Sequence, residues 1–373
     1  MLPNRCGMEI IVKPKFAKVK AEQDLFFQLR SQVTQTVKDL EPKRWFIIKL
    51  KAFLFPVLYV TAYGVVLLYG TNAYVLYFCY FFFGCSIAFI FLNLIHDAVH
   101  NTLFRHKWIN QWCVYFLDLL GANSYTWKVR HVKLHHNYPN VMGWDSDFEQ
   151  SPMARIFPHG TYSKIHKYQH LYLPVLYLLF LFNWLLIRDF KDFFNRSSLV
   201  WKVTKIATGE YIKLFIFKAF YLFYIFIVPK IILALTWSEM FGAYLTMIFT
   251  ASIPSLIILL SPHATPESEF PLPDNKGHLP DTWFKHQLST TNDVNHDNWF
   301  TRFFLGCFNF HIAHHLFPYI NHVYYPEVTK VVSDFAKKNH LPYRIFPIWT
   351  SLYNHYRLLK TNARHDNIFE EAM

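Results

Sequence analysis

The sequence predicts an all-α integral membrane protein with four transmembrane helices in two hairpins, together with interfacial helices and a cytoplasmic helical cap. Three observations lead to this prediction: a composition too apolar for a soluble domain, four apolar stretches of span length, and very short links within each pair. Of the 373 residues, 53% are hydrophobic, 20% aromatic and 17% charged, whereas soluble domains carry about 25% charged residues. The surplus of apolar side chains therefore needs an apolar surrounding such as a bilayer.

The four apolar stretches are each close to the roughly 20 residues that cross a hydrocarbon core. They cover residues 53–70, 73–95, 212–235 and 240–261. Only Thr71 and Asn72 separate the first two stretches, and four residues beginning at Thr236 separate the last two. Because links this short hold neighbouring helices antiparallel, each pair is predicted to be a helical hairpin.

The distribution of Lys and Arg predicts which side of the membrane each segment faces. Eleven Lys or Arg residues precede the first span, and residues 101–133 and 329–364 are also basic, whereas the two hairpin links carry none. Cytoplasmic loops are enriched in Lys and Arg. Both termini and the long middle stretch, 96–211, are therefore expected in the cytoplasm.

A further apolar piece, 171–187, is predicted to lie in the membrane interface rather than to cross it. A fifth crossing there would place the residues after the fourth span on the opposite side from the start of the middle stretch. The chain then divides into a cytoplasmic N-terminal segment (1–52), a membrane domain with its cytoplasmic cap (53–345) and a C-terminal tail (346–373).

The charge and cysteine content exclude several other classes of protein. The net charge is +12, and because the basic residues flank apolar segments, anionic membrane lipids explain them better than nucleic acid does. The five cysteines form no CxxC pair, which argues against a zinc ribbon or a disulfide framework. Residues 1–45 are polar, so no signal peptide is expected.

Eight of the 20 histidines fall in three tight clusters with the patterns HxxxH, HxxxHH and HxxHH. In chain order they are His96 and His100, then His131, His135 and His136, then His311, His314 and His315. Residues three or four apart share one face of a helix, so each cluster is expected to point two or three imidazoles at one spot. Their positions after the second and fourth spans place all three at the cytoplasmic face.

These clusters indicate a pair of metal ions. Neutral imidazole is a common ligand of transition metals. His263, two residues past the fourth span, is expected at the same level and would bring the number of imidazoles to nine. Nine ligands exceed what one ion accepts, whereas two ions, each with an open position, would use them. His286 is the competing choice for the ninth ligand.

At these residues the chain resembles the membrane-bound fatty acid desaturases, whose pattern is HxxxH, then HxxHH or HxxxHH, then [HQ]xxHH. The surrounding sequence adds to the resemblance, which covers about residues 50–345. FNFHIAHHLFP and HHNYPNVMGWDSD are similar to the third and second boxes of front-end and bacterial acyl desaturases, and EFPLPDNKG with HQLSTTNDV resembles the stretch before the third box. One departure is His311, where eukaryotic front-end desaturases usually have Gln.

The resemblance implies a non-haem di-iron centre that uses O2 and two electrons to introduce a cis double bond into an acyl chain. Its two iron ions would be held by His96, His100, His131, His135, His136, His263, His311, His314 and His315. Ligating imidazoles usually donate their other N–H to a carboxylate or carbonyl. Candidates for that supporting role are Asp97, Asp145, Asp147 and Glu149.

The resemblance also implies partners. Many eukaryotic front-end desaturases carry a fused cytochrome b5 domain with a His-Pro-Gly-Gly motif, which is absent from this sequence. A separate ferredoxin, or a cytochrome b5 with its reductase, is therefore expected to supply electrons. The acyl substrate would be carried on CoA, on an acyl carrier protein or on a lipid. The membrane would be the inner membrane of a bacterium or the endoplasmic reticulum of a eukaryote.

Two other functions fit parts of the pattern. A di-iron lipid hydroxylase or ketolase shares the histidine boxes and differs only in how the substrate is placed. A histidine-rich transporter without enzymatic activity would carry ionisable groups along a path inside the spans, whereas these histidine clusters lie outside the predicted spans. The sequence therefore favours the acyl desaturase.

Overall fold

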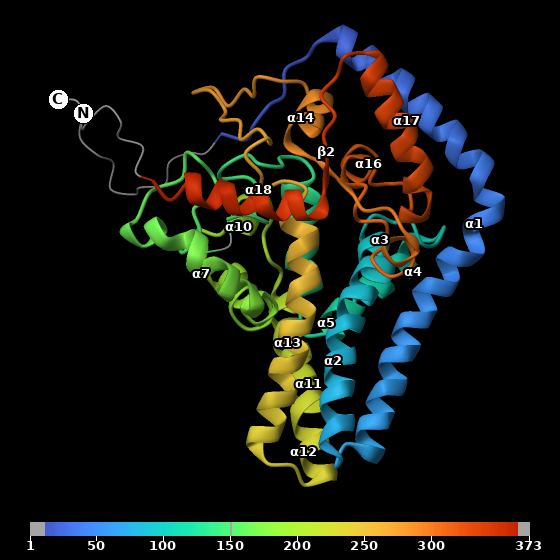
Figure 1. Ribbon diagram of the computed structural model, residues 1–373, viewed down its shortest axis with the longest axis vertical. Coiled ribbons are helices and arrows are strands. Elements are labelled where there is room, and N and C mark those ends of the chain that lie inside the picture. Colours follow the sequence, from blue (N-terminus) through green and yellow to red (C-terminus); the bar gives the residue numbers. More distant parts are fainter. Residues whose placement is uncertain (1–11, 150, 365–373) are drawn as a thin grey trace.

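Two helical hairpins form a stem in this computed structural model, which describes residues 12–149 and 151–364. The first hairpin pairs α1 (Lys20–Tyr69) with α2 (Ala73–Ile90). The second pairs α11 (Thr208–Leu222), η6 (Phe223–Ile227) and α12 (Val228–Leu233) with α13 (Trp237–Leu260). Figure 1 shows both hairpin turns at the same end of the stem. The predicted helical character is confirmed, and the four apolar stretches lie in these two hairpins.

Side-chain caps mark the start of the returning helix in each hairpin. Asn72 accepts hydrogen bonds from the backbone amides of Tyr74 (2.9 Å) and Val75 (3.4 Å) at the start of α2. Thr236 and Glu239 form a reciprocal capping box at the start of α13. Such caps satisfy amides that have no partner within the helix, so the chain turns sharply at both links.

α2 packs against both α1 and α13, and Gly84 sets its distance from α13. A Cβ atom on Gly84 would lie 2.6 Å from the Met247 carbonyl oxygen and 2.6 Å from Thr250 Cβ. Small residues at helix contacts in membranes let two backbones approach closely. The close contact between α2 and α13 therefore depends on having glycine, which has no side chain, at position 84.

Gly84→Ala is expected to destabilise the stem by about 1–3 kcal/mol, because the added methyl group forces α2 and α13 apart. The matched control is Gly64→Ala, since a Cβ at Gly64 on α1 meets no described atom within 4 Å. Thermal unfolding of the purified protein in detergent would measure both. Equal melting temperatures for the two variants would contradict the close contact.

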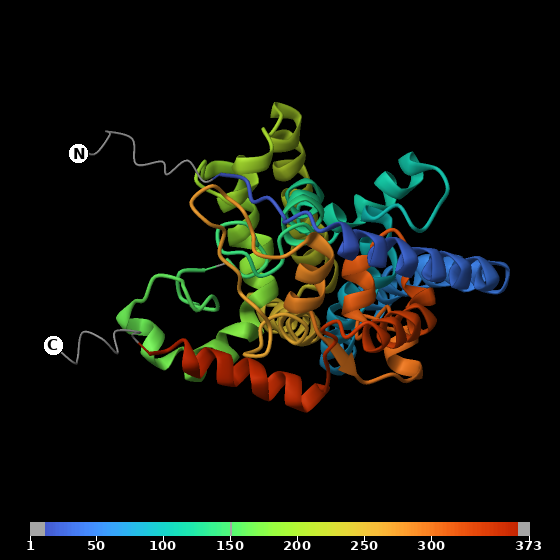
Figure 2. The ribbon, with the colours of Figure 1, turned by 90° about the horizontal axis from the view of Figure 1, so that it is seen from above.

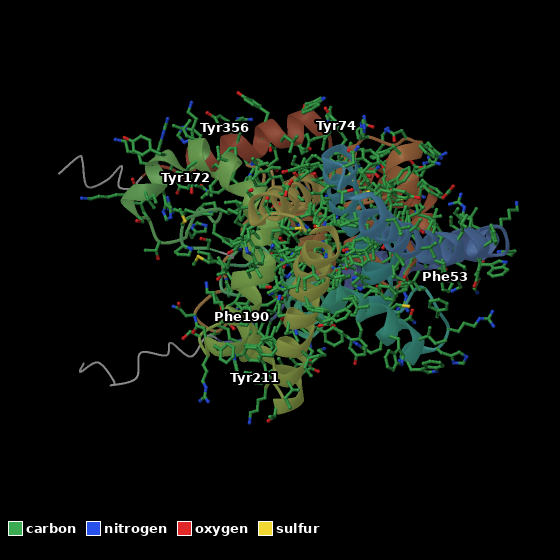
Figure 3. All side chains as sticks on the ribbon, turned by 90° about the horizontal axis from the view of Figure 1, so that it is seen from below. Phe53, Tyr74, Tyr172, Phe190, Tyr211 and Tyr356 are labelled. Atoms are coloured by element: carbon green, nitrogen blue, oxygen red, sulfur yellow. The ribbon has the colours of Figure 1, made fainter. Side chains whose placement is uncertain are left out.

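The stem exposes apolar side chains around its outside. Phe53 and Tyr74 are 62% and 88% exposed, and Figure 3 shows them on the periphery of the molecule. Large exposed apolar surfaces mark contact with a membrane or a partner. Five described helical stretches are long and apolar enough to cross a membrane: Lys20–Tyr69, Ala73–Val99, Lys164–Phe194, Thr208–Leu233 and Trp237–Ile258.

The stretch Lys164–Phe194 contains the piece that the sequence assigns to the interface. It consists of η3 (Lys164–Tyr168), α7 (Gln169–Leu176), η4 (Tyr177–Leu179), α8 (Phe180–Asn183), η5 (Trp184–Arg188) and α9 (Asp189–Phe194). Its length and composition would allow a crossing. However, Figures 1 and 2 show that it runs across the upper part of the stem rather than alongside it. The topology with four spans stays a prediction.

The remaining elements gather around the end of the stem opposite the hairpin turns (Figure 1). The helices there are α3 (His96–Val99), α4 (Lys107–Val114), α5 (Phe116–Leu119), α6 (Ser124–Lys128), η2 (Val129–His135), α10 (Leu199–Val203), α14 (Trp283–Thr290), α15 (Trp299–Phe303), α16 (His311–Leu316), η7 (His322–Tyr324), α17 (Tyr325–Lys338) and α18 (Ile348–Thr361). Strands β1 (Asp293–Asn295) and β2 (Ile345–Pro347) pair in parallel, with Val294 opposite Phe346. This cap contains all three histidine clusters.

The predicted segment boundaries fall inside continuous structure. α1 runs without a break through the boundary at residue 52, and residue 346 lies within β2. α18 is anchored to α7, since Gln169 donates to the Leu359 carbonyl oxygen at 2.8 Å. The division into three segments stays a prediction, and its outermost parts, 1–11 and 365–373, lie outside the described residues.

Candidate metal centre

The histidine clusters are carried by short helices that continue or adjoin the stem. α2 passes through a π-helical turn, η1 (Phe91–Ile95), directly into α3, which begins at His96. The second cluster lies on another π-helix, η2, where the amide of His136 donates to the His131 carbonyl oxygen at 3.0 Å. The third cluster lies on α16. Single π-helical turns within helices are frequent at functional sites.

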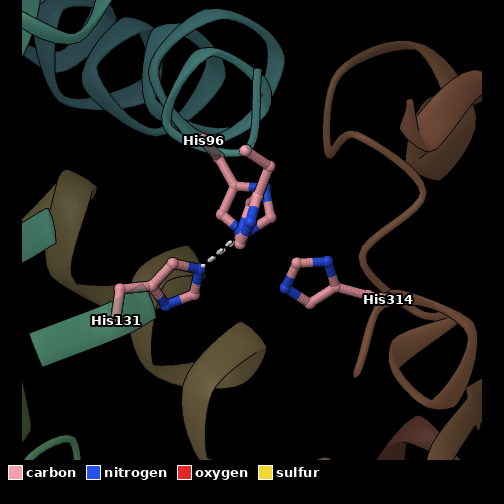
Figure 4. Close-up of side chains that lie close together, drawn as sticks. His96, His131 and His314 are labelled. Carbon is pink, nitrogen blue, oxygen red and sulfur yellow. Dashed lines mark hydrogen bonds between the residues drawn. The ribbon is translucent and has the colours of Figure 1, made fainter. Parts of the chain in front are cut away.

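Eight of the nine histidines form two groups of four. The first group is His96, His100, His131 and His314, and the second is His135, His263, His311 and His315. Within each group, one nitrogen from every ring lies within 4.8 Å of the others. Figure 4 shows His96, His131 and His314 converging from three separate segments.

His136 lies between the two groups. Its ring centroid is 4.7 Å from that of His100 in the first group and 4.7 Å from that of His315 in the second. Its Nε2 atom is 3.2 Å from Nε2 of His131. All nine predicted ligands are therefore brought together in one buried region.

The second and third clusters each divide between the two groups, which differs from the expectation that each cluster points at one spot. His131 joins the first group and His135 the second, although they are four residues apart on one helix. The π-helical turn instead brings His131 close to His136, five residues on, because its backbone bonds span five residues. On α16, consecutive His314 and His315 face opposite groups.

Two outer nitrogens in the second group have partners that determine the tautomer of their ring. Nδ1 of His135 lies 3.1 Å from Asp145 Oδ1, and Nδ1 of His263 lies 3.0 Å from the Thr290 carbonyl oxygen. Both partners only accept hydrogen bonds, so each Nδ1 carries a proton. In the neutral ring, Nε2 then presents a lone pair toward the centre of the group.

His315 shows that these lone pairs need a cation. Its Nδ1 lies 3.0 Å from Gln287 Oε1, which leaves its Nε2 as an acceptor in the neutral ring. That atom is only 3.0 Å from Nε2 of His263. Two lone pairs at this distance repel, unless both bind one ion. Ligands at right angles around an ion with bonds of about 2.1 Å lie about 3.0 Å apart, so the donor set fits a metal.

The first group also has more ring nitrogens than hydrogen bonds can satisfy. Nε2 of His131 lies 3.1 Å from that of His100 and 3.2 Å from that of His96. A neutral ring has one proton to share, so it cannot donate to both. Nε2 of His314 is buried without a hydrogen-bond partner among the described residues, while its Nδ1 lies 3.1 Å from the Tyr325 hydroxyl. These nitrogens fit a second ion.

Burial keeps most of the rings neutral, and hence able to bind metal, at neutral pH. It lowers the pKa of His263 to about 3, and it lowers the pKa values of six others well below the usual range: His100, His131, His136, His311, His314 and His315. His135 differs, since burial opposes its charge but Asp145 and Asp147 raise its pKa to about 9. A metal bound at its Nε2 would displace that proton.

The four acids predicted to support the ligands have different partners. Asp145 contacts His135 and also accepts from the amides of Asn140 (2.9 Å) and Asp147 (3.0 Å). Asp147 Oδ2 is 3.9 Å from Nδ1 of the same histidine. Glu149 accepts from the Gly143 amide.

Asp97 pairs with a histidine outside the three clusters. Its Oδ2 lies 2.6 Å from Nδ1 of His322 and accepts from Asn321 Nδ2 at 2.8 Å. The competing ninth ligand also lies elsewhere: Nε2 of His286 is 3.0 Å from the Pro139 carbonyl oxygen, outside both groups. The structure therefore brings His263, and not His286, to the other imidazoles.

Three partners of the ligands were not singled out from the sequence: the Gln287 side chain, the Thr290 carbonyl and the Tyr325 hydroxyl. Gln287 and Thr290 lie within HQLSTTNDV, the stretch that resembles the region before the third box. The signal was therefore present in the sequence, but nothing in its spacing shows which polar residue faces a ligand.

A narrow, mostly apolar cavity runs beside both groups of histidines. Five of the proposed ligands line it: His96, His131, His135, His263 and His311. Most other wall residues are apolar, such as Ile87 from α2, Leu117 from α5 and Leu181 from α8. Cavities with mostly apolar walls and a few polar groups are typical of small-molecule sites.

The fold and the site together define an α-helical protein of the membrane type with two groups of buried histidines suited to metal. The sequence model described as fatty acid desaturase matches residues 72–347. The chain belongs to the fatty acid desaturase family, and the resemblance seen in the histidine boxes is confirmed.

Characterised relatives are acyl-chain desaturases by name. The acyl-lipid (8-3)-desaturase of Physcomitrium patens is 28% identical, over 81% of this chain and 63% of the relative. The sn-1 linoleoyl-lipid 6-desaturase of Synechocystis is 29% identical, over 75% and 80%. The Delta(5) fatty acid desaturase A of Dictyostelium discoideum is 30% identical, over 72% and 61%. The chain thus spans less than two thirds of the length of the first and third of these relatives.

Proposed function

We propose that this protein is an O2-dependent desaturase that introduces a cis double bond into the acyl chain of a lipid. The observation that carries the proposal is the apolar cavity that passes both histidine groups. An acyl chain lying there would have its methylenes beside the ligands. The relatives named as acyl-lipid and linoleoyl-lipid desaturases support the same class of substrate.

Two iron ions are the proposed cofactor, one in each group of four histidines. His136, between the groups, would be the ninth ligand. Iron suits imidazole ligands, and when bound it would supply the O2-derived oxidising power that removes hydrogen from unactivated methylenes. That there are two ions, and that they are iron, is part of this proposal. The presence of two separate groups of four nitrogens supports the number of ions.

The surrounding residues would hold the ligands rigid and keep water away from the reacting methylenes. Asp145 and Gln287 each accept a hydrogen bond from the outer nitrogen of a ligand, which orients the ring and raises its basicity. Trp127 stacks on His131, with ring centroids 5.2 Å apart and an interplanar angle of 13°. The apolar wall of the cavity offers water few hydrogen-bond partners. It would therefore keep solvent away from the reacting methylenes and prevent competing reactions.

The proposed topology has four spans, with the histidines on the cytoplasmic side. It is supported by the position of the cap at the end of the stem opposite the hairpin turns (Figure 1). In this arrangement a soluble ferredoxin, or a membrane-bound cytochrome b5 with its reductase, would deliver electrons to the basic cytoplasmic face. Electrostatic complementarity of this kind mainly speeds association.

Expression in cells that lack the protein, followed by gas chromatography and mass spectrometry of their fatty acids, tests this function. The expected product is a new cis double bond at one position of existing acyl chains. The His131→Ala variant, expressed at the same level, should give the profile of untransformed cells. An acyl product that has gained an oxygen atom would instead identify a hydroxylase, and an unchanged profile would contradict the proposed reaction.

A further inference from the structure

One part of the cavity wall carries hydrogen-bond donors that no described residue satisfies. Arg130, which lines the cavity, is 1% exposed, and its Nε and Nη2 atoms are buried without acceptors among the described residues. Nη1 pairs with Asp192. Nη2 is 3.9 Å from Asp189 Oδ1, which is beyond hydrogen-bonding distance. The guanidinium therefore has donors to spare at the cavity.

Trp184 adds a third donor to the same wall. It lines the cavity, and its indole Nε1 is also buried without an acceptor in the described part of the chain. The Arg130 guanidinium carbon lies 5.8 Å from the centre of the Trp184 ring. Leaving buried donors without partners is energetically costly. Donors from two neighbouring side chains thus indicate that an acceptor belongs in this part of the cavity.

We propose that Arg130 and Trp184 form a binding site for the carbonyl oxygen of the substrate's acyl ester or thioester. This inference rests on the proposed function and names the group that anchors the chain. The carbonyl oxygen has two lone pairs and no donor, so it suits a site made only of N–H groups. Because Arg130 directly precedes His131, and both line the cavity, the anchored end would lie beside the metal-binding groups.

The charges around Arg130 favour a neutral acceptor over a free carboxylate. Arg130 pairs with Asp192 and lies 3.9 Å from Asp189, and Lys218 pairs with Asp189 at 2.7 Å. Nearby, Arg188 lies 3.9 Å from Asp147. Three cations thus face three carboxylates, and all six side chains are buried. A free fatty acid would add an unbalanced negative charge, which is strongly unfavourable in a buried site.

Competition binding with the metal-loaded protein in lipid nanodiscs tests the site. A fluorescent acyl reporter would be displaced by a diacyl glycerolipid, by its dialkyl ether analogue with the same headgroup and chain length, and by an acyl-CoA. Wild-type protein is expected to bind the ester about tenfold more tightly than the ether, as one charge-assisted hydrogen bond would give. The glycerolipid and acyl-CoA arms identify which carrier supplies the carbonyl.

Two variants should remove this preference for the ester. Arg130→Met combined with Asp192→Asn removes the guanidinium donors together with the charge of their partner, and the ester-to-ether ratio should fall close to one. Trp184→Phe removes a single N–H and should lower the ratio partway. The matched control is Trp144→Phe, since Nε1 of Trp144 is likewise buried without a described acceptor but Trp144 does not line this cavity. Its ratio should equal that of wild type.

The outcomes separate this inference from the proposed function. Equal binding of ester and ether to wild-type protein, or tighter binding of a free fatty acid than of its ester, would overturn the carbonyl site alone. Failure of every acyl ligand to displace the reporter would overturn the proposed function as well. Metal content reports whether the double variant folds. If it does not fold, the ester-to-ether ratio of Trp184→Phe decides the test.

Discussion

His314→Ala and His315→Ala are each expected to remove a different metal ion, although the two residues are consecutive in the chain. His314 belongs to the first group of four nitrogens and His315 to the second. Each single variant should therefore bind about one ion per chain, and the double variant close to none. Turnover should fall at least about 100-fold in all three, since even loss of a ligand's outer partner costs about 10–100-fold. Inductively coupled plasma mass spectrometry of purified protein measures the ions.

The matched control for this experiment is His286→Ala. His286 is buried like the ligands, but its Nε2 contacts the Pro139 carbonyl oxygen and it lies outside both groups. Its variant should keep both ions. A double variant of His314 and His315 that still binds one ion would show that both residues serve the same ion, which would contradict the division of the third cluster between two groups.

The hairpins and the ligand set could be predicted because both depend on local features of the sequence. Span length and short links are properties of contiguous residues, and positions 71–72 form the observed turn at the start of α2. The spacing of the histidines, together with their place after each hairpin, was enough to predict that His263 joins the clusters. The structure brings all nine rings together, eight of them in the two groups of four, and their role as metal ligands stays a prediction.

The division of the ligands could not be predicted, because it depends on contacts between distant segments. Helical spacing suggested that His131 and His135 point together, but the π-helical turn at η2 separates them. The pairing of Asp97 with His322 could not be predicted either, because His322 lies 225 positions further along the chain. The cavity wall likewise draws on residues from Ile87 to His311, whose approach only the packed stem creates.

Asp145→Asn is expected to weaken metal binding in the second group about 10–100-fold, because Asp145 is the outer partner of the proposed ligand His135. Asp145 is fully buried and also accepts from the amides of Asn140 and Asp147. Asparagine keeps one acceptor oxygen but places an NH2 group among these donors. Competition with a metal chelator at neutral pH measures the affinity of each ion, and only one of the two should change.

Asp97→Asn is the matched comparison, since Asp97 is also a buried acid near the histidine clusters but pairs with His322 instead of a proposed ligand. Nε2 of His322 lies 2.6 Å from Nζ of the buried Lys51. Removing the carboxylate leaves these groups without a counter-charge, which should cost about 3–5 kcal/mol of stability. We therefore expect a lower melting temperature with metal affinity within about threefold of wild type. If Asp97→Asn instead released metal while Asp145→Asn did not, the assignment of the supporting acids would be reversed.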